Sequence, residues 1–159
     1  MNSKIEIRPM NAADLAQVLA IAETLPEAPH WPQSAYLNAI NSQIDPTSTP
    51  RRIALVVAGA QAGSVLGFAV ASLLPPQAEL EAIAVAAESQ RQGLGQLFFR
   101  ALAAELKAAG AHELLLEVRA SNRPAGAFYR TLGFVQIGLR PSYYTDPIED
   151  AVLMRLPLA

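Results

Sequence analysis

The sequence predicts an α/β (α+β) domain in which about four helices flank a mixed central sheet of six to seven strands. Two observations lead to this fold class. The first half of the chain contains a β-hairpin, and the second half alternates strands with helices, as a βαβ unit does. With 159 residues, of which 52% are hydrophobic and 16% charged, residues 1–159 have the length and composition of a single globular domain.

Hydrophobic periodicity and turn residues place the individual elements. The expected strands are residues 4–8, 52–58, 64–74, 79–86, 112–118, 134–140 and 150–156. The expected helices are a segment carrying Leu15, Val18, Leu19 and Ala22, a segment carrying Tyr36, Leu37 and Ile40, residues 93–109 and residues 122–132. Asn11 or Asp14 can cap the first helix, and Gly110 and Gly133 end the last two. Proline-containing segments at 26–32 and 46–50 separate the early elements, residues 59–63 connect the hairpin, and Pro75-Pro76 ends it.

Composition and charge exclude several classes of protein. The chain has no cysteine, which rules out disulfides and a thiolate metal site, and its two histidines lie far from any carboxylate cluster, so no metal is expected. The net charge of −2 and the absence of long basic runs disfavour a nucleic-acid-binding surface. We expect neither a membrane span nor a signal peptide, and a cytoplasmic location.

A glycine-containing turn between a strand and a helix is the first candidate binding element. It reads Gln90-Arg91-Gln92-Gly93-Leu94-Gly95. Free N–H groups and the helix dipole attract anions at such a turn, and Arg91 adds a positive charge. The alternatives are a plain turn or a nucleotide loop. A dinucleotide loop would need a third glycine where Phe98 stands, and the Gly-Lys-Ser/Thr of nucleotide hydrolases is absent.

The turn matches the Q/R-x-x-G-x-G/A pattern of the GNAT superfamily of N-acetyltransferases, and the segments around it extend the resemblance over about residues 79–156. The matching segments are Ile83-Ala84-Val85, residues 90–95, residues 116–122, Phe128-Tyr129, Leu132-Gly133-Phe134 and Tyr143-Tyr144. Within the superfamily they resemble the bacterial enzymes that acetylate the N-terminal alanine of a ribosomal protein. The first half of the chain is similar only loosely, through Trp31.

The resemblance implies a GNAT fold with a bulged fourth strand and acetyl-CoA as cosubstrate. In this family the pantetheine arm of the cofactor enters a gap beside the fourth strand, where Ile83, Ala84 and Val85 fall. The alternative is that Ile83 and Val85 are simply core residues of a buried strand. The remaining residues implied in cofactor binding are Arg91, Gln92, Gly93, Leu94, Gly95, Gln96 and Asn122.

Acetyl transfer requires a base for the amine and an acid for the departing thiolate. Glu117 lies on the opposite face of its strand from Leu116 and Val118, near the carboxyl end, where α/β proteins place ligands. The resemblance makes Glu117 the base and Tyr129 the acid. The alternatives are a surface salt bridge for Glu117, a core role for Tyr129, and a base drawn from the fourth strand at Glu79 or Glu81.

The expected acceptor is a peptide α-amine, here the N-terminal alanine of a ribosomal protein. An α-amine, with a pKa near 8, is neutral more often at pH 7 than a lysine, with a pKa of about 10.4. The resemblance implies that Tyr143 and Tyr144 line one side of the peptide entrance and Trp31 the other. The alternative is that these aromatic residues only pack against their neighbours. A small amine or lysine as acceptor and a non-catalytic acyl-CoA sensor remain alternatives.

Overall fold

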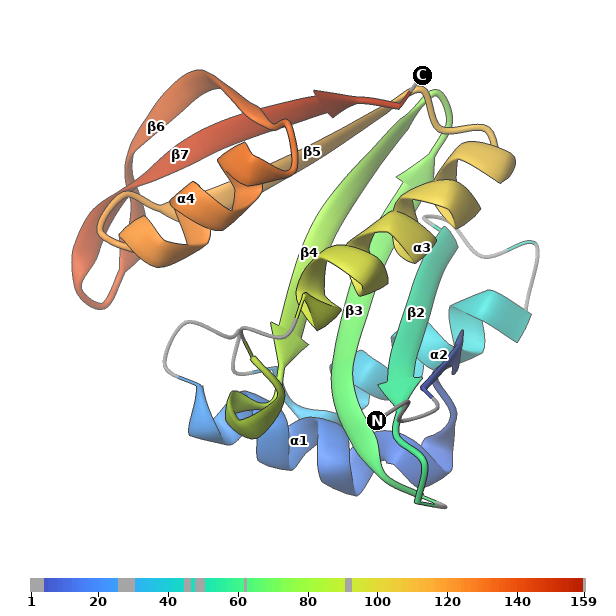
Figure 1. Ribbon diagram of the computed structural model, residues 1–159. Helices are drawn as coiled ribbons and strands as arrows, with labels where there is room; N and C mark the ends of the chain where they lie inside the picture. The colour runs from blue at the N-terminus through green and yellow to red at the C-terminus, as the bar shows by residue number, and fades with distance from the viewer. Residues whose placement is uncertain are drawn as a thin grey trace.

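The structure is a computed structural model that describes residues 5–25, 31–44, 47, 51–61, 63–90 and 93–158. The described residues form a seven-stranded sheet in the order β1-β2-β3-β4-β5-β7-β6 (Figure 1). In chain order the elements are β1 (Glu6–Pro9), η1 (Ala12–Asp14), α1 (Leu15–Thr24), α2 (Gln33–Ile44), β2 (Arg51–Ala58), β3 (Val65–Leu74), β4 (Gln77–Val85), η2 (Ala87–Ser89), α3 (Leu94–Ala108), β5 (Glu113–Arg119), α4 (Arg123–Thr131), β6 (Val135–Thr145) and β7 (Ile148–Pro157). The fold class expected from the sequence is confirmed.

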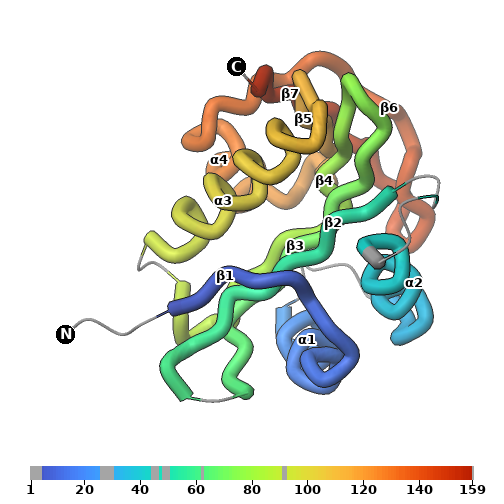
Figure 2. Tube along the Cα trace, turned by 90° about the vertical axis from the view of Figure 1, so that its right-hand side faces the viewer, coloured from blue at the N-terminus to red at the C-terminus, as the bar shows by residue number. Residues whose placement is uncertain are grey.

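The helices cover both faces of the sheet. α3 and α4 lie on one side and α1 and α2 on the other, as Figures 1 and 2 show from two directions. Two buried clusters result. Phe98 and Leu102 of α3 pack with Leu55 on the first face, and Val18 and Tyr36 pack on the second. The strands between these layers are therefore buried on both sides.

Most predicted boundaries agree with the structure to within two residues, and the differences have local causes. β4 begins at Gln77, because Pro75-Pro76 forms the turn of a tight β3–β4 hairpin. β6 continues to Thr145 beyond the predicted end at residue 140, across an irregularity in its pairing with β7. The predicted break at 26–32 and loop at 46–50 lie largely outside the described residues.

A β-bulge at Glu81 reverses the faces of β4. Ala82 pairs with Val70 and Leu80 pairs with Ala71, so Glu81 is the extra residue on β4. Without a bulge, the strand period of two would place Leu80 and Ala82 on one face. Instead, Leu80 packs in the α3 cluster and Ala82 in the α1–α2 cluster. The bulged fourth strand expected from the resemblance is confirmed.

β4 and β5 separate just before the bulge. Within these two fully described strands, parallel pairing ends at Glu79 and Leu115. β5 instead continues with β7 as far as Arg119, and Figure 1 shows β4 and β5 diverging from their shared end. The β5-facing edge of β4 beyond Glu79 is thus left for a ligand to pair with.

Candidate active site

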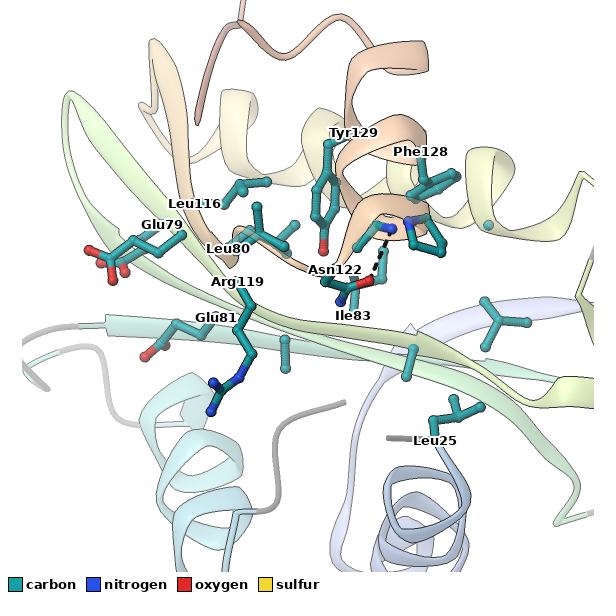
Figure 3. Close-up of a pocket in the computed structure, with 18 of the residues that line it drawn as sticks. Leu25, Glu79, Leu80, Glu81, Ile83, Leu116, Arg119, Asn122, Phe128 and Tyr129 are labelled. Carbon is teal, nitrogen blue, oxygen red and sulfur yellow. Dashed lines mark hydrogen bonds between the residues drawn. The ribbon is translucent and has the colours of Figure 1, made fainter. Parts of the chain in front are cut away.

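The split between β4 and β5 opens into a cavity of about 1070 Å³. Its walls come from β4, β5, the start of α3, α4 and the β6–β7 hairpin (Figure 3). The predicted site residues that line it are Trp31, Ile83, Ala84, Val85, Gly93, Gly95, Gln96, Glu117, Asn122, Tyr129, Tyr143 and Tyr144. Tertiary structure thus brings residues from both halves of the chain around one space.

The amino terminus of α3 opens onto this cavity. Gly93 is the N-cap, with a left-handed φ of 75° that favours glycine. The first turn of an α-helix leaves backbone N–H groups without helical partners, so Gly95 and Gln96 present such groups beside a positive dipole end. A Cβ on Gly95 would lie 3.3 Å from the Phe128 ring. The first turn of α3 has the geometry of an anion site.

Gln90 joins this turn to the end of β4. Its side-chain amide donates a hydrogen bond of 2.9 Å to the Val85 carbonyl, and Gln90 itself lines the cavity. Arg91 and Gln92, two of the predicted cofactor residues, lie outside the described residues. The Leu94 side chain is buried in the α3 cluster and is not among the residues that line the cavity, so only its backbone remains a candidate for cofactor binding.

Ile83, Ala84 and Val85 pack into the core and also line the cavity. The side chains of Ile83 and Val85 are half-buried against the α3 cluster, and Ala84 is buried in the opposite one. All three also line the cavity along the open edge of β4. The packing of these side chains into the core therefore holds β4 in place, with its backbone edge facing the split between β4 and β5.

Glu117 both lines the cavity and forms a salt bridge. Oε1 of Glu117 lies 3.2 Å from Nη1 of Arg140. The Tyr143 hydroxyl hydrogen-bonds the same carboxylate, and this bond is the main cause that raises the pKa of Tyr143. The Glu117 side chain is 23% exposed, so it is accessible from the cavity while held by two groups of β6.

Two further carboxylates share this end of the cavity. Glu79 has a raised pKa, chiefly because burial penalises its charge and next because Glu117 and Glu81 lie near it. Glu81 forms an ion pair of 2.9 Å with Arg52 of β2. Glu79 and Glu81, kept as rival bases on sequence grounds, are both placed in the cavity wall and stay candidates.

Tyr129 projects from α4 toward the split. Burial, with a smaller contribution from Tyr144, raises the pKa of Tyr129 to about 12. Figure 3 shows its hydroxyl pointing to the side of the cavity where Asn122 lies. The Asn122 side chain accepts a hydrogen bond of 3.3 Å from the Ala125 N–H and so caps α4. The phenol is protonated at neutral pH and can act as a proton donor.

Aromatic residues from both halves of the chain also line the cavity. Tyr143 and Tyr144 come from β6, and the Arg119 guanidinium stacks 4.1 Å from the centre of the Tyr144 ring. Trp31 packs against Tyr36, with ring centres 5.3 Å apart. The other residues of the segment 27–31 lie outside the described residues.

Sequence reasoning did not single out several cavity residues. Arg119 lines the cavity and Arg140 holds Glu117, yet neither was named. Arg119 lies within a matched segment, two residues after Glu117 on the same face, which is a signal that could have found it. Arg140 gave no such signal, because its contact spans 23 residues.

The described residues offer neither a membrane-spanning helix nor a cluster of metal ligands. None of the described helices combines the length and apolar character that crossing a membrane requires. The described histidine, aspartate and glutamate side chains do not gather in threes at a spacing that could hold a metal ion.

Known proteins share this sequence and fold. Residues 16–134 match the model of the Acetyltransferase (GNAT) family. The chain is 44% identical to the [Ribosomal protein bS18]-alanine N-acetyltransferase of Escherichia coli K12 over 101 residues, which are 62% of this chain and 68% of that protein. It is 30% identical to the putative enzyme of the same name from Bacillus subtilis over 154 residues, which are 97% of this chain and 96% of that protein. The crystal structure of the ribosomal-protein-S18-alanine N-acetyltransferase from Escherichia coli superimposes with a TM-score of 0.78 at 32% identity, covering 98% of this chain and 95% of that one.

The split parallel strands, the helix terminus and the carboxylates define an acyl-CoA-dependent acyltransferase. The family match then makes the class specific: the chain belongs to the Acetyltransferase (GNAT) family and is an acetyl-CoA-dependent N-acetyltransferase.

Proposed function

We propose that this chain transfers the acetyl group of acetyl-CoA to the N-terminal alanine of ribosomal protein bS18, in the cytoplasm. The observation that carries the proposal is the cavity in the β4–β5 split, which gathers Glu117, Tyr129 and the start of α3 around one space. The acceptor is taken from the similarity to enzymes with that printed activity.

The described residues fit acetyl-CoA. The open edge of β4 from Ile83 to Val85 offers backbone groups to the amides of a pantetheine arm, as a neighbouring strand would. The N–H groups at the start of α3 fit the pyrophosphate, and Asn122, at the start of α4, lines the same cavity. Arg91, Gln92 and the backbone of Leu94 belong to the same proposed phosphate site. Bound acetyl-CoA supplies the activated acetyl thioester.

Glu117 and Tyr129 divide the proton transfers. The amine must lose a proton to become a nucleophile, and the Glu117 carboxylate accepts it directly or through water. The departing thiolate must gain a proton, and the Tyr129 hydroxyl, kept protonated by its raised pKa, donates it. A protein that only sensed acyl-CoA would need neither group.

The acceptor enters beside the β6–β7 hairpin. Tyr143 and Tyr144 form one side of this entrance and Trp31 the other, and all three line the cavity. The carboxyl groups of Glu79, Glu81 and Glu117 line this end, and a carboxylate is a suitable hydrogen-bond partner for an amine that arrives as an ammonium group.

The acceptor is tested by following thiol release from acetyl-CoA with matched substrates. They are a peptide with the N-terminal sequence of bS18, the same peptide with its N-terminus blocked and a lysine added, and a polyamine. We expect turnover with the free N-terminus alone, with mass spectrometry placing the acetyl group on alanine. Turnover of the blocked peptide would make the protein a lysine acetyltransferase, and turnover of the polyamine would make it a small-amine acetyltransferase. If none of the three substrates is acetylated, the remaining function is binding of acyl-CoA without catalysis.

A further inference from the structure

Arg140 is positioned to balance two carboxylates that share the cavity. Its guanidinium lies 3.2 Å from Glu117, and it also lowers the pKa of Glu79, against the raising effects of burial and of Glu117. Glu79 belongs to β4 and Glu117 to β5, whereas Arg140 belongs to β6. The β6–β7 hairpin therefore supplies the guanidinium that pairs with Glu117.

The charged and titratable groups that share this end of the cavity with Glu117 come from three strands. β4 contributes Glu79 and Glu81, β5 contributes Arg119, and β6 contributes Arg140, Tyr143 and Tyr144. β7, the hydrogen-bonded neighbour of β5, places an apolar residue opposite Glu117. Arg140 also stacks on Tyr143, with its guanidinium carbon 5.0 Å from the ring centre. Arg140, Tyr143 and Glu117 thus form a mutually contacting set, with Arg140 as the cation.

Two carboxylates in one site raise each other's proton affinity, so that one of them tends to take up a proton. At Glu79 the Arg140 guanidinium opposes this effect, because it stabilises the charged form of that carboxyl group. At Glu117 the same guanidinium is a direct ion-pair partner that fixes the position of the carboxylate. The arginine does not need to touch the substrate for the reaction to depend on it.

We propose that Arg140 is a positioning residue for Glu117: its guanidinium, paired with the Glu117 carboxylate and stacked on Tyr143, holds that carboxylate on the acceptor side of the cavity. This inference rests on the proposed function in one respect, the assignment of Glu117 as the base. It adds a requirement that the family resemblance did not supply, namely a cation delivered by the hairpin.

The inference is tested by titrating the side-chain carboxyl groups of the full chain, labelled with ¹³C at the glutamate carboxyl carbon, by NMR. The Glu117 resonance is identified as the one missing from Glu117→Gln. In Arg140→Gln we expect its titration midpoint to move to higher pH by about half a pH unit, the size suited to a partly exposed ion pair. Arg140→Lys should largely restore the wild-type midpoint.

Arg155→Gln is the matched control. Arg155 pairs with Glu113, also a contact between the β6–β7 hairpin and a β5 carboxylate, but neither residue is among those that line the cavity. We expect this variant to leave the Glu117 midpoint unchanged. Thermal unfolding and acetyl-CoA binding of each variant report whether the fold is intact.

The pH dependence of kcat, measured on the same variants, separates the inference from the proposed function. An unmoved Glu117 midpoint in Arg140→Gln overturns the role of Arg140, whatever the rate. A midpoint that moves while the acid limb of kcat stays in place supports the role of Arg140 and overturns Glu117 as the base. If the Glu117 midpoint and the acid limb of kcat move together, the result supports both the role of Arg140 and Glu117 as the base.

Discussion

Ser121 and Glu149 join two walls of the cavity. The Ser121 N–H and hydroxyl donate hydrogen bonds of 2.9 and 2.7 Å to Oε1 of Glu149. Ser121 directly precedes Asn122, which caps α4, and Glu149 pairs in register with Tyr144 of the aromatic wall. Because these bonds fix the hairpin to the start of α4, they set the distance between the aromatic entrance and the proposed acid.

Glu149→Ala should raise the KM for the acceptor peptide several-fold and leave acetyl-CoA affinity close to wild type. The reason is that the β6–β7 hairpin loses its side-chain hydrogen bonds to Ser121 before α4, whereas the start of α3 is untouched. Steady-state kinetics with each substrate varied in turn checks this. Glu113→Ala removes a carboxylate from the far end of the same β5–β7 pair and serves as the control. Equal peptide KM values in the two variants would show that the attachment has no effect on the acceptor.

Glu117→Gln should slow transfer most at low pH, where the acceptor is an ammonium ion and needs a base. Above a pH of about 8 the α-amine is increasingly neutral by itself, so the deficit should narrow. The check is the ratio of wild-type to variant kcat between pH 6 and 9. Glu79→Gln is the comparison: a larger, more pH-dependent loss in Glu79→Gln would move the base to β4.

Tyr129→Phe should lower kcat by about 100-fold, a typical contribution of a general acid, with acetyl-CoA affinity retained. Burial raises the pKa of Tyr129 to about 12, so the phenol stays protonated well above the pH at which an ordinary tyrosine ionises. The deficit should therefore be the same from pH 7 to pH 10. Tyr36→Phe is the control, since the Tyr36 hydroxyl is buried without a hydrogen-bond partner among the described residues. Normal turnover by Tyr129→Phe would remove it as the acid.

Gly126→Ala should stabilise the protein by up to about 1 kcal/mol, because alanine is the better helix former and Gly126 lies inside α4. A Cβ there would meet the flexible end of Arg130 at 3.5 Å. Urea unfolding measures the change in the free energy of unfolding. Gly133→Ala should do the opposite, since Gly133 has a φ of 104° and its Cβ would lie 3.1 Å from Leu156. A lower free energy of unfolding for Gly126→Ala would mean that the contact with Arg130 costs more than the gain in helix propensity.

The sequence by itself predicted the order of strands and helices and the glycine turn before α3. These features are local: periodicity, capping residues and short motifs depend on neighbours along the chain. The family resemblance gave the candidate pair Glu117 and Tyr129 and the bulge in β4, though without the position of the bulge. The roles of the site residues remain predictions.

Tertiary structure decided how these pieces meet. The bulge lies at Glu81 because pairing with β3 shifts there, and it determines which residues of β4 face each core cluster. Arg140 reaches Glu117 because the β6–β7 hairpin folds back onto β5, and Ser121 reaches Glu149 for the same reason. Such contacts join residues more than twenty positions apart, so they depend on strand register and order, which hydrophobic periodicity does not encode.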